Sequence, residues 1–284
     1  MSDDLLQEIA QGSPAGADEK TRQGSTTRLP CWPKLATALP RAVAAFGGEG
    51  PVNVVCPMEI FLIRHGQPDW APARIATNDP ELTELGHRQS LLLADRIAGW
   101  ERLDEVLVST MRRAQQTAAP LQTFGLQPAA YDWLQEINNP PDWEGSPVDR
   151  IEEILAKGRL RPIDEMWDGL PGGESFRDFH KRVVAGMEDV LAARGLTRLI
   201  DGHPHLWHVA NDSLRLAIVA HGGANAVILG TLLGLEPTPW EWERFAMGHA
   251  SIAHLRTEKI AEGRAFSLRA FADASHLPPE LRTE

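Results

Sequence analysis

The sequence predicts an α/β fold, in the form of a three-layer α/β/α sandwich with a mostly parallel central sheet and a cap insertion. Short apolar runs of strand length alternate with segments whose apolar residues recur every three or four positions, which is typical of helices that cover both faces of a parallel sheet. Two of the apolar runs end in His-Gly, at His65 and at His221. The segment 138–174 breaks the alternation with many Pro and Gly residues, and we therefore expect it to form a cap over the sheet.

The N-terminal part of the chain differs from the remainder. Residues 1–57 are rich in Gly, Pro, Ser, Thr and Ala, and they show little strand or helix periodicity. We therefore expect residues 1–57 to be a flexible N-terminal extension. Residues 58–284 are expected to form one domain that contains the cap as an insertion.

The helices and strands of that domain can be assigned in chain order. Thr83 and Ser175 each precede an amphipathic segment, where a hydroxyl can accept hydrogen bonds from the free amides of the first turn. Gly99, Gly125 and Gly195 follow such segments and are typical helix ends. The expected elements are a strand at 58–63, a helix from Thr83 to about Trp100, a strand at 106–108, a helix at 112–124, a strand at 131–137, a cap helix at 151–157, a helix from Ser175 to Gly195, a strand at 214–220, a helix to Leu233, and strands at 251–257 and 265–271.

Composition limits the classes of function. The chain has 284 residues, of which 43% are hydrophobic, enough for one sizeable domain. Its formal net charge of −11 repels nucleic acids and anionic membranes, so we expect neither as a partner. Cys31 and Cys56 provide no disulfide framework or zinc pattern. No apolar run is long enough to span a bilayer, and Asp3, Asp4 and Glu8 stand where a signal peptide would be basic. A cytoplasmic location is expected.

The two His-Gly pairs point to a functional site. Arg64-His65-Gly66 follows the first strand, and His221-Gly222-Gly223 follows the strand at 214–220. In open α/β sheets, ligands bind beyond the carboxyl ends of the strands. If the two strands are neighbours, both imidazoles meet at one site.

Further motifs accompany these two pairs in a definite order. The set comprises Arg64-His65-Gly66, Ser109-Thr110-Met111-Arg112-Arg113-Ala114, Leu134-Gln135-Glu136-Ile137, Trp143-Glu144-Gly145, Gly172-Gly173-Glu174-Ser175-Phe176 and His221-Gly222-Gly223. Together these motifs resemble the histidine phosphatase superfamily, also called phosphoglycerate mutase-like. The resemblance covers roughly Glu59 to Ala272.

The resemblance implies a role for each catalytic residue. His65 would be the nucleophile and form a phosphohistidine, while its second ring nitrogen donates a hydrogen bond to a nearby backbone carbonyl. Arg64, Arg113 and His221 would bind the phosphoryl group and stabilise its charge in the transition state. The family spacing Ser-x-x-x-Arg-Ala selects Arg113 over the adjacent Arg112.

A general acid and two further binding residues complete the implied site. The family's acid lies in a Leu-x-Glu segment, which Leu134-Gln135-Glu136 matches. Glu144 and Glu174 are the alternatives. Gly222 and Trp70 are expected to contact the substrate.

One departure concerns the phosphate contacts. The family often has Arg-His-Gly-Glu-Ser/Thr-x-x-Asn, whereas this chain continues Gln67-Pro68-Asp69-Trp70-Ala71 and lacks the Asn. The absence of that Asn puts the individual phosphate contacts in question but not the reaction class.

The resemblance implies a phosphomonoester hydrolase that acts on a small phosphorylated metabolite. The first alternative is a cofactor-dependent phosphoglycerate mutase, since mutases of the superfamily carry an Arg pair before a proline run and Arg159-Leu160-Arg161-Pro162 is a loose match. The second is a non-catalytic phospho-ligand binding protein. We expect no cofactor and no metal, although the three His within 203–208 could bind one. A small phosphorylated substrate is the expected partner, and a homodimer is kept open.

Overall fold

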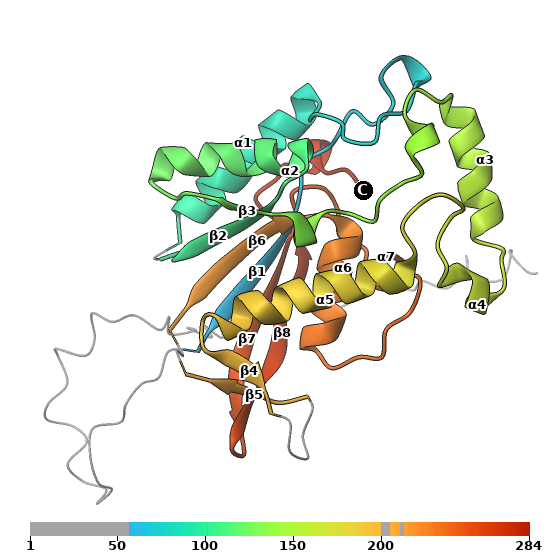
Figure 1. Ribbon diagram of the computed structural model, residues 1–284. Helices are drawn as coiled ribbons and strands as arrows, with labels where there is room; N and C mark the ends of the chain where they lie inside the picture. The colour runs from blue at the N-terminus through green and yellow to red at the C-terminus, as the bar shows by residue number, and fades with distance from the viewer. Residues whose placement is uncertain (1–56, 101, 200–204, 211–212) are drawn as a thin grey trace, which may run out of the picture. The chain divides into compact units, whose positions relative to one another are not determined.

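An eight-stranded mixed sheet organises the chain (Figure 1), with the strand order β3-β2-β6-β1-β7-β8-β5-β4. The computed structural model describes residues 57–100, 102–199, 205–210 and 213–284. The strands are β1 (Glu59–Arg64), β2 (Glu105–Ser109), β3 (Ala129–Tyr131), β4 (Leu196–Arg198), β5 (Trp207–Val209), β6 (Arg215–Ala220), β7 (Ile252–Ile260) and β8 (Gly263–Asp273). The helices are α1 (Glu84–Ala98), α2 (Arg112–Ala118), α3 (Val148–Gly158), α4 (Ile163–Met166), α5 (Phe176–Ala192), α6 (Gly222–Leu232) and α7 (Glu241–Arg244).

The two strands that end in His-Gly are neighbours. β1 pairs with β6 in parallel, and the register places Arg64 opposite Ala220. His65 and His221 are the next residues of the two strands, so both leave the sheet at the same edge. The expectation that the two imidazoles meet is confirmed, because their ring centroids lie 5.0 Å apart.

The prediction of a mostly parallel sheet is wrong. β2 pairs in parallel with β6 and β3, but β7 runs antiparallel to β1, and β8, β5 and β4 continue antiparallel beyond it. β7 and β8 pair from Ile260 and Gly263 onwards, so only residues 261–262 connect them. So short a connection can only reverse the chain, whereas a parallel strand needs a long crossover. The α/β class is confirmed, and the three-layer arrangement stays a prediction.

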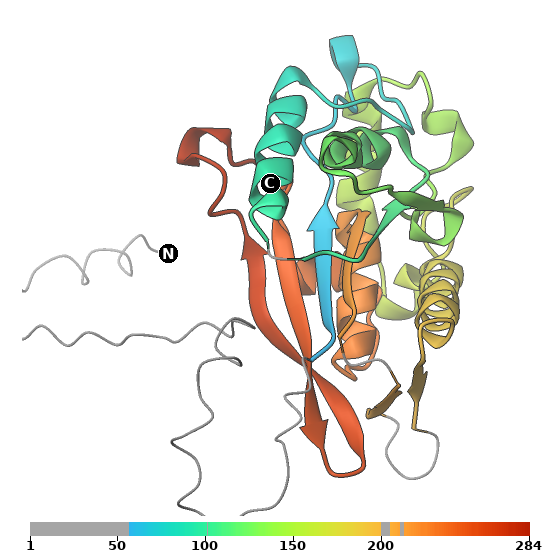
Figure 2. The ribbon, with the colours of Figure 1, turned by 90° about the vertical axis from the view of Figure 1, so that its left-hand side faces the viewer.

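Hydrophobic clusters lie on both faces of the central strands. In β1, Ile60 and Leu62 belong to one cluster, whereas the alternate residues Phe61 and Ile63 belong to another. The first cluster includes apolar side chains of α5 and α6, and the second includes those of α1 and α2. Figures 1 and 2 show these two pairs of helices on opposite sides of the central strands. The packing fixes β1 and β6, and with them the site at their ends.

The predicted helix starts are confirmed. The Thr83 hydroxyl accepts a hydrogen bond from the Gly86 amide at 2.9 Å, and the Ser175 hydroxyl accepts one from the Asp178 amide at 3.0 Å. The helix expected at 112–124 continues beyond α2 as a 3-10 helix at Ala119–Phe124. Pro120 lacks the amide hydrogen that a continued α-helix needs.

The strand expected at 131–137 was misplaced. β3 ends at Tyr131, and a 3-10 turn follows at Asp132–Leu134. Tyr131 pairs with Ser109, the last residue of β2, so the chain has no strand partner beyond it. Two short strands, β4 and β5, were not expected at all.

The expected cap, residues 138–174, contains α3 and α4, so the predicted helix at 151–157 is confirmed. The predicted extension lies outside the described residues apart from Pro57, as do residues 203–204 of the histidine-rich segment. His208 of that segment lies in β5. Within the described residues, no helix has the length and apolar character needed to cross a membrane.

Candidate active site

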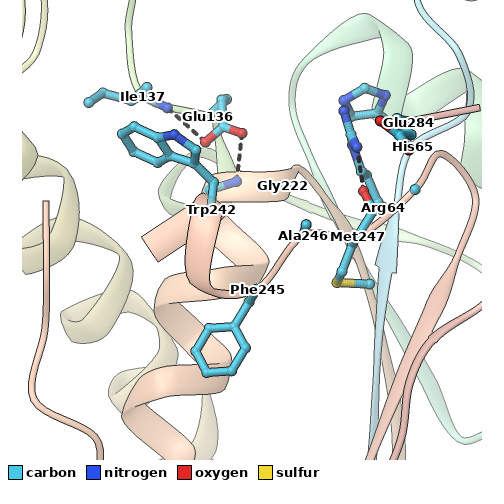
Figure 3. Close-up of a pocket in the computed structure, with 12 residues that line it drawn as sticks. Arg64, His65, Glu136, Ile137, Gly222, Trp242, Phe245, Ala246, Met247 and Glu284 are labelled. Carbon is cyan, nitrogen blue, oxygen red and sulfur yellow. Dashed lines mark hydrogen bonds between the residues drawn. The ribbon is translucent and has the colours of Figure 1, made fainter. Parts of the chain in front are cut away.

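A cavity of about 530 Å³ opens at the edge of the sheet where β1 and β6 end. Four of the predicted site residues line it, namely Arg64, His65, Glu136 and Gly222. Arg113 and His221 do not line this cavity, but both lie next to His65. The chain from Trp242 to Gly248 forms another wall. Figure 3 shows Glu136 across the cavity from Arg64 and His65.

The hydrogen bonds of His65 define its tautomer. Its Nε2 atom accepts a hydrogen bond from Nε of Arg113 at 3.2 Å, so the ring proton is on Nδ1. Nδ1–H donates to the carbonyl oxygen of Gly66 at 2.7 Å. Burial, together with the positive charges of Arg113 and Arg64, lowers the pKa of His65 well below its ordinary value. The ring is therefore neutral at pH 7, and its nucleophilic lone pair lies on Nε2.

Two arginines supply cationic donors beside that lone pair. Arg113 is 8% exposed, and Arg64 is partly buried. Arg64 Nη1 donates to the carbonyl oxygen of Met247, whereas Arg64 Nε is buried without a hydrogen-bond partner in the described part of the chain. Arg113 Nη1 also lacks a hydrogen bond there, but it lies 3.7 Å from Oδ1 of Asp79. Buried donors are rarely left unpaired. Arg64 Nε therefore marks a place where an anion would bind, close to the guanidinium of Arg113.

His221 lies beside His65 and is fully buried. Its Nε2 atom lies 2.8 Å from the hydroxyl of Ser109, and its Nδ1 atom has no hydrogen-bond partner among the described residues. Burial and the charge of Arg113 lower the pKa of His221 well below its ordinary value. The ring is therefore neutral and keeps one nitrogen for a ligand.

Glu136 is the only one of the three candidate acids that lines the cavity. Its Oε2 atom accepts a hydrogen bond from the amide of Gly223 at 2.9 Å, in the first turn of α6. The carboxyl group of Glu136 lies so close to the backbone of residue 223 that only glycine fits there, since a Cβ at Gly223 would come within 2.4 Å of Oε1 of Glu136. Glu144 is exposed and accepts from the amide of Asn78 at 2.7 Å. Glu174 pairs with Arg182 at 2.7 Å.

Trp70 does not line this cavity. Its side chain is 41% exposed in the loop after β1. Trp143 is buried against Ala76 and Ile151, and Trp167 packs on the main core. The predicted contact of Trp70 with the substrate stays a prediction.

His249 was missed by the sequence reasoning. Its Nε2 atom accepts a hydrogen bond from Nη2 of Arg64 at 3.3 Å, and its Nδ1 atom lies 2.9 Å from the hydroxyl of Thr283. Burial and the charge of Arg64 lower the pKa of His249 to about 3. The Gly248-His249 pair directly before an expected strand was the available signal.

The neutral imidazole of His65, the cationic donors of Arg64 and Arg113 and the carboxyl group of Glu136 together suit a tetrahedral oxyanion. Phosphoryl transfer needs this combination of a positioned nucleophile and positive groups around the equatorial oxygens. The chain as a whole is acidic, so the local arginines and the buried polar atoms are what attract an anion to this edge of the sheet.

The chain is similar in sequence to a known protein family and to individual proteins. A sequence profile of the histidine phosphatase superfamily (branch 1) matches residues 60–265. Glucosyl-3-phosphoglycerate phosphatase of Mycolicibacterium vanbaalenii is 29% identical over 206 residues, which are 72% of this chain and 86% of that protein. The probable phosphoglycerate mutase GpmB of Yersinia enterocolitica is 29% identical over 184 residues, which are 63% of this chain and 77% of that protein.

A solved structure is similar in fold and sequence. The mycobacterial glucosyl-3-phosphoglycerate phosphatase in complex with inorganic phosphate superposes with a TM-score of 0.56 and 26% sequence identity. The match covers 78% of this chain and 99% of that one.

Proposed function

Since the chain belongs to the histidine phosphatase superfamily (branch 1), we propose that it is a phosphomonoester hydrolase that acts through a phosphohistidine intermediate on a small phosphorylated metabolite. The observation that carries this proposal is the hydrogen bond of 3.2 Å from Arg113 Nε to the lone pair of His65 Nε2, because His65 lines the same cavity as Glu136. A nucleophile, a phosphoryl-binding cation and an acid are thereby present in one site.

In the first step, Nε2 of His65 attacks phosphorus and the bond from phosphorus to the ester oxygen breaks. The Nε–H group of Arg113 leaves Nε2 of His65 and donates to a phosphoryl oxygen instead. The unpaired Nε–H group of Arg64 donates to a second phosphoryl oxygen. The carbonyl of Gly66, which accepts from Nδ1–H at 2.7 Å, stabilises the positive charge that the ring acquires. Glu136 in its acid form protonates the departing alkoxide.

In the second step, water attacks the phosphohistidine. The carboxylate of Glu136 takes a proton from that water, the bond from nitrogen to phosphorus breaks, and His65 regains its lone pair. Inorganic phosphate leaves. His65 and Glu136 therefore serve both halves of the reaction.

A phosphoglycerate mutase is the second candidate, supported by the name of the Yersinia relative. The cap arginines argue against it. Arg159 pairs with Glu243 at 3.0 Å, and Arg161 Nη1 donates to the carbonyl oxygen of Gly169 at 2.7 Å. Both guanidinium groups are therefore engaged with the protein. A non-catalytic binding protein is disfavoured because it needs neither an aligned imidazole lone pair nor Glu136.

Phosphate release from a panel of phosphorylated metabolites, including glucosyl-3-phosphoglycerate and 3-phosphoglycerate, tests the proposal. Rapid quench with labelled substrate should trap an acid-labile, base-stable adduct on His65, and His65→Ala should abolish turnover. An adduct on His221 or on a carboxylate would contradict the mechanism. Formation of 2-phosphoglycerate from 3-phosphoglycerate without phosphate release would favour the mutase.

A further inference from the structure

A second cavity of about 520 Å³ adjoins the active site beneath the cap. Residues from the C-terminal part of α3, from α4 and from the segment 239–243 line it. Ile137 and Trp242 line this cavity and the cavity of His65, so the two cavities adjoin at these side chains. Figure 3 shows both residues beside Glu136.

The walls of this cap cavity are mainly apolar. The apolar side chains that line it include Ile137, Leu155, Met166, Leu170, Phe176 and Trp242. Leu155 is 42% exposed and Trp242 is 36% exposed, while Phe176 and Trp242 meet edge to face at 5.7 Å. Large apolar side chains that remain exposed around one concavity are typical of a ligand site.

The charged side chains of the lining are engaged with other protein groups. Arg159 pairs with Glu243 at 3.0 Å across the rim. Arg161 donates through Nη1 to the carbonyl oxygen of Gly169 at 2.7 Å and through Nε to that of Gly158 at 3.3 Å. These contacts hold the arginines at the rim, and most of the lining that remains for a ligand is apolar.

We propose that the cap cavity binds the organic part of the substrate, and that the substrate is a phosphomonoester with an apolar chain or ring of several carbon atoms. This inference rests on the proposed function. Glu136 protonates the ester oxygen there, and Ile137 follows it in the chain. The group bonded to the ester oxygen therefore extends along Ile137 and Trp242 into the cap cavity.

A series of n-alkyl phosphates from ethyl to octyl, with 2-naphthyl phosphate and 3-phosphoglycerate, provides the test. The value of kcat/KM should rise about three- to fourfold for each added methylene until the cavity is filled, mainly through KM. A flat series, or a preference for 3-phosphoglycerate over octyl phosphate, would overturn the inference while leaving the hydrolase intact. Failure to hydrolyse every ester would instead overturn the proposed function.

Leu155→Glu provides a second test with a matched control. Leu155 is half-exposed at the cavity wall, so a carboxylate there is compatible with folding, and it should lower the ratio of octyl to ethyl phosphate turnover about tenfold. The control is Leu160→Glu on the same cap, because Leu160 is 87% exposed and does not line the cavity. The ratio of octyl to ethyl phosphate turnover in Leu160→Glu should equal that of the unaltered protein. An unchanged ratio for Leu155→Glu would contradict the inference.

Discussion

The guanidinium of Arg113 donates through Nε to Nε2 of His65 at 3.2 Å, so the proposed nucleophile and the proposed phosphoryl-binding group are already in contact. Arg113 lies in the first turn of α2, whereas His65 follows β1. Because Arg113 is almost fully buried, its side chain has few other positions to occupy. The contact therefore orients the His65 ring, with the Nε2 lone pair directed at the guanidinium that we propose binds the phosphoryl group.

Arg113→Lys should lower kcat/KM on the order of a hundredfold, because an ammonium cannot bind two phosphoryl oxygens as a planar guanidinium does. Inhibition by vanadate should weaken in parallel. The matched control is Arg112→Lys, since Arg112 is exposed and pairs with Glu81 at 2.6 Å. If Arg112→Lys lost activity while Arg113→Lys kept it, Arg112 and not Arg113 would be the phosphoryl-binding residue.

Glu136→Gln should slow the phosphorylation step for alkyl phosphates about a hundred- to ten-thousand-fold, because the departing alkoxide then lacks a proton donor. Phosphorylation by p-nitrophenyl phosphate should fall much less, since nitrophenolate leaves without protonation. Rapid-quench measurement isolates this step from the later attack of water. Glu144→Gln, which alters an exposed carboxylate outside the cavity, is the control. Equal losses for both substrates would mean that Glu136 only positions the phosphoryl group.

His249→Phe should weaken the binding of inorganic phosphate, measured as competitive inhibition, by about tenfold. Phenylalanine keeps the ring but removes the acceptor of the Arg64 hydrogen bond, and hydrogen bonds to charged groups contribute about 1.5–3 kcal/mol. Thr283→Val should have a smaller effect of the same kind, because the Thr283 hydroxyl contacts Nδ1 of His249 at 2.9 Å.

Thr283→Ser retains the hydroxyl and should restore phosphate binding to its original strength. If Thr283→Ser is as impaired as Thr283→Val, the methyl group and not the hydroxyl is the important feature. A structural role alone would change the melting temperature without changing phosphate inhibition.

The free energy of unfolding should fall as pH decreases below about 6.5. The pKa of His65, His221 and His249 is lowered in the folded protein. As pH falls, these rings therefore bind protons in the unfolded chain before they do so in the folded protein, and this stabilises the unfolded chain. For His249 this loss continues to about pH 3, the pKa it has when folded. Urea unfolding at pH 7.5, 6 and 5 measures the decline. His249→Asn should make it less steep, and an unchanged slope would contradict the assignment of a neutral buried ring.

Much of the site could be predicted because strand ends carry a local signal. His65 and His221 each follow an apolar run, and parallel pairing brings such ends together. Glu136 was selected by motif alone, and its position depends on the turn after Tyr131 that periodicity did not indicate. His249 and Thr283 could not be linked from sequence, because their contact requires the path of the chain after β8.

The direction of β7 determines which end of that strand lies at the site. Because β7 runs against β1, the edge at which β1 and β6 end is the edge at which β7 begins. His249 lies just before that beginning. In a fully parallel sheet, the residues that precede a strand lie at the opposite edge, away from the ligand. A substitution at His249 would therefore change the surroundings of Arg64 while β1 and β6, the strands that end at His65 and His221, stay unaltered.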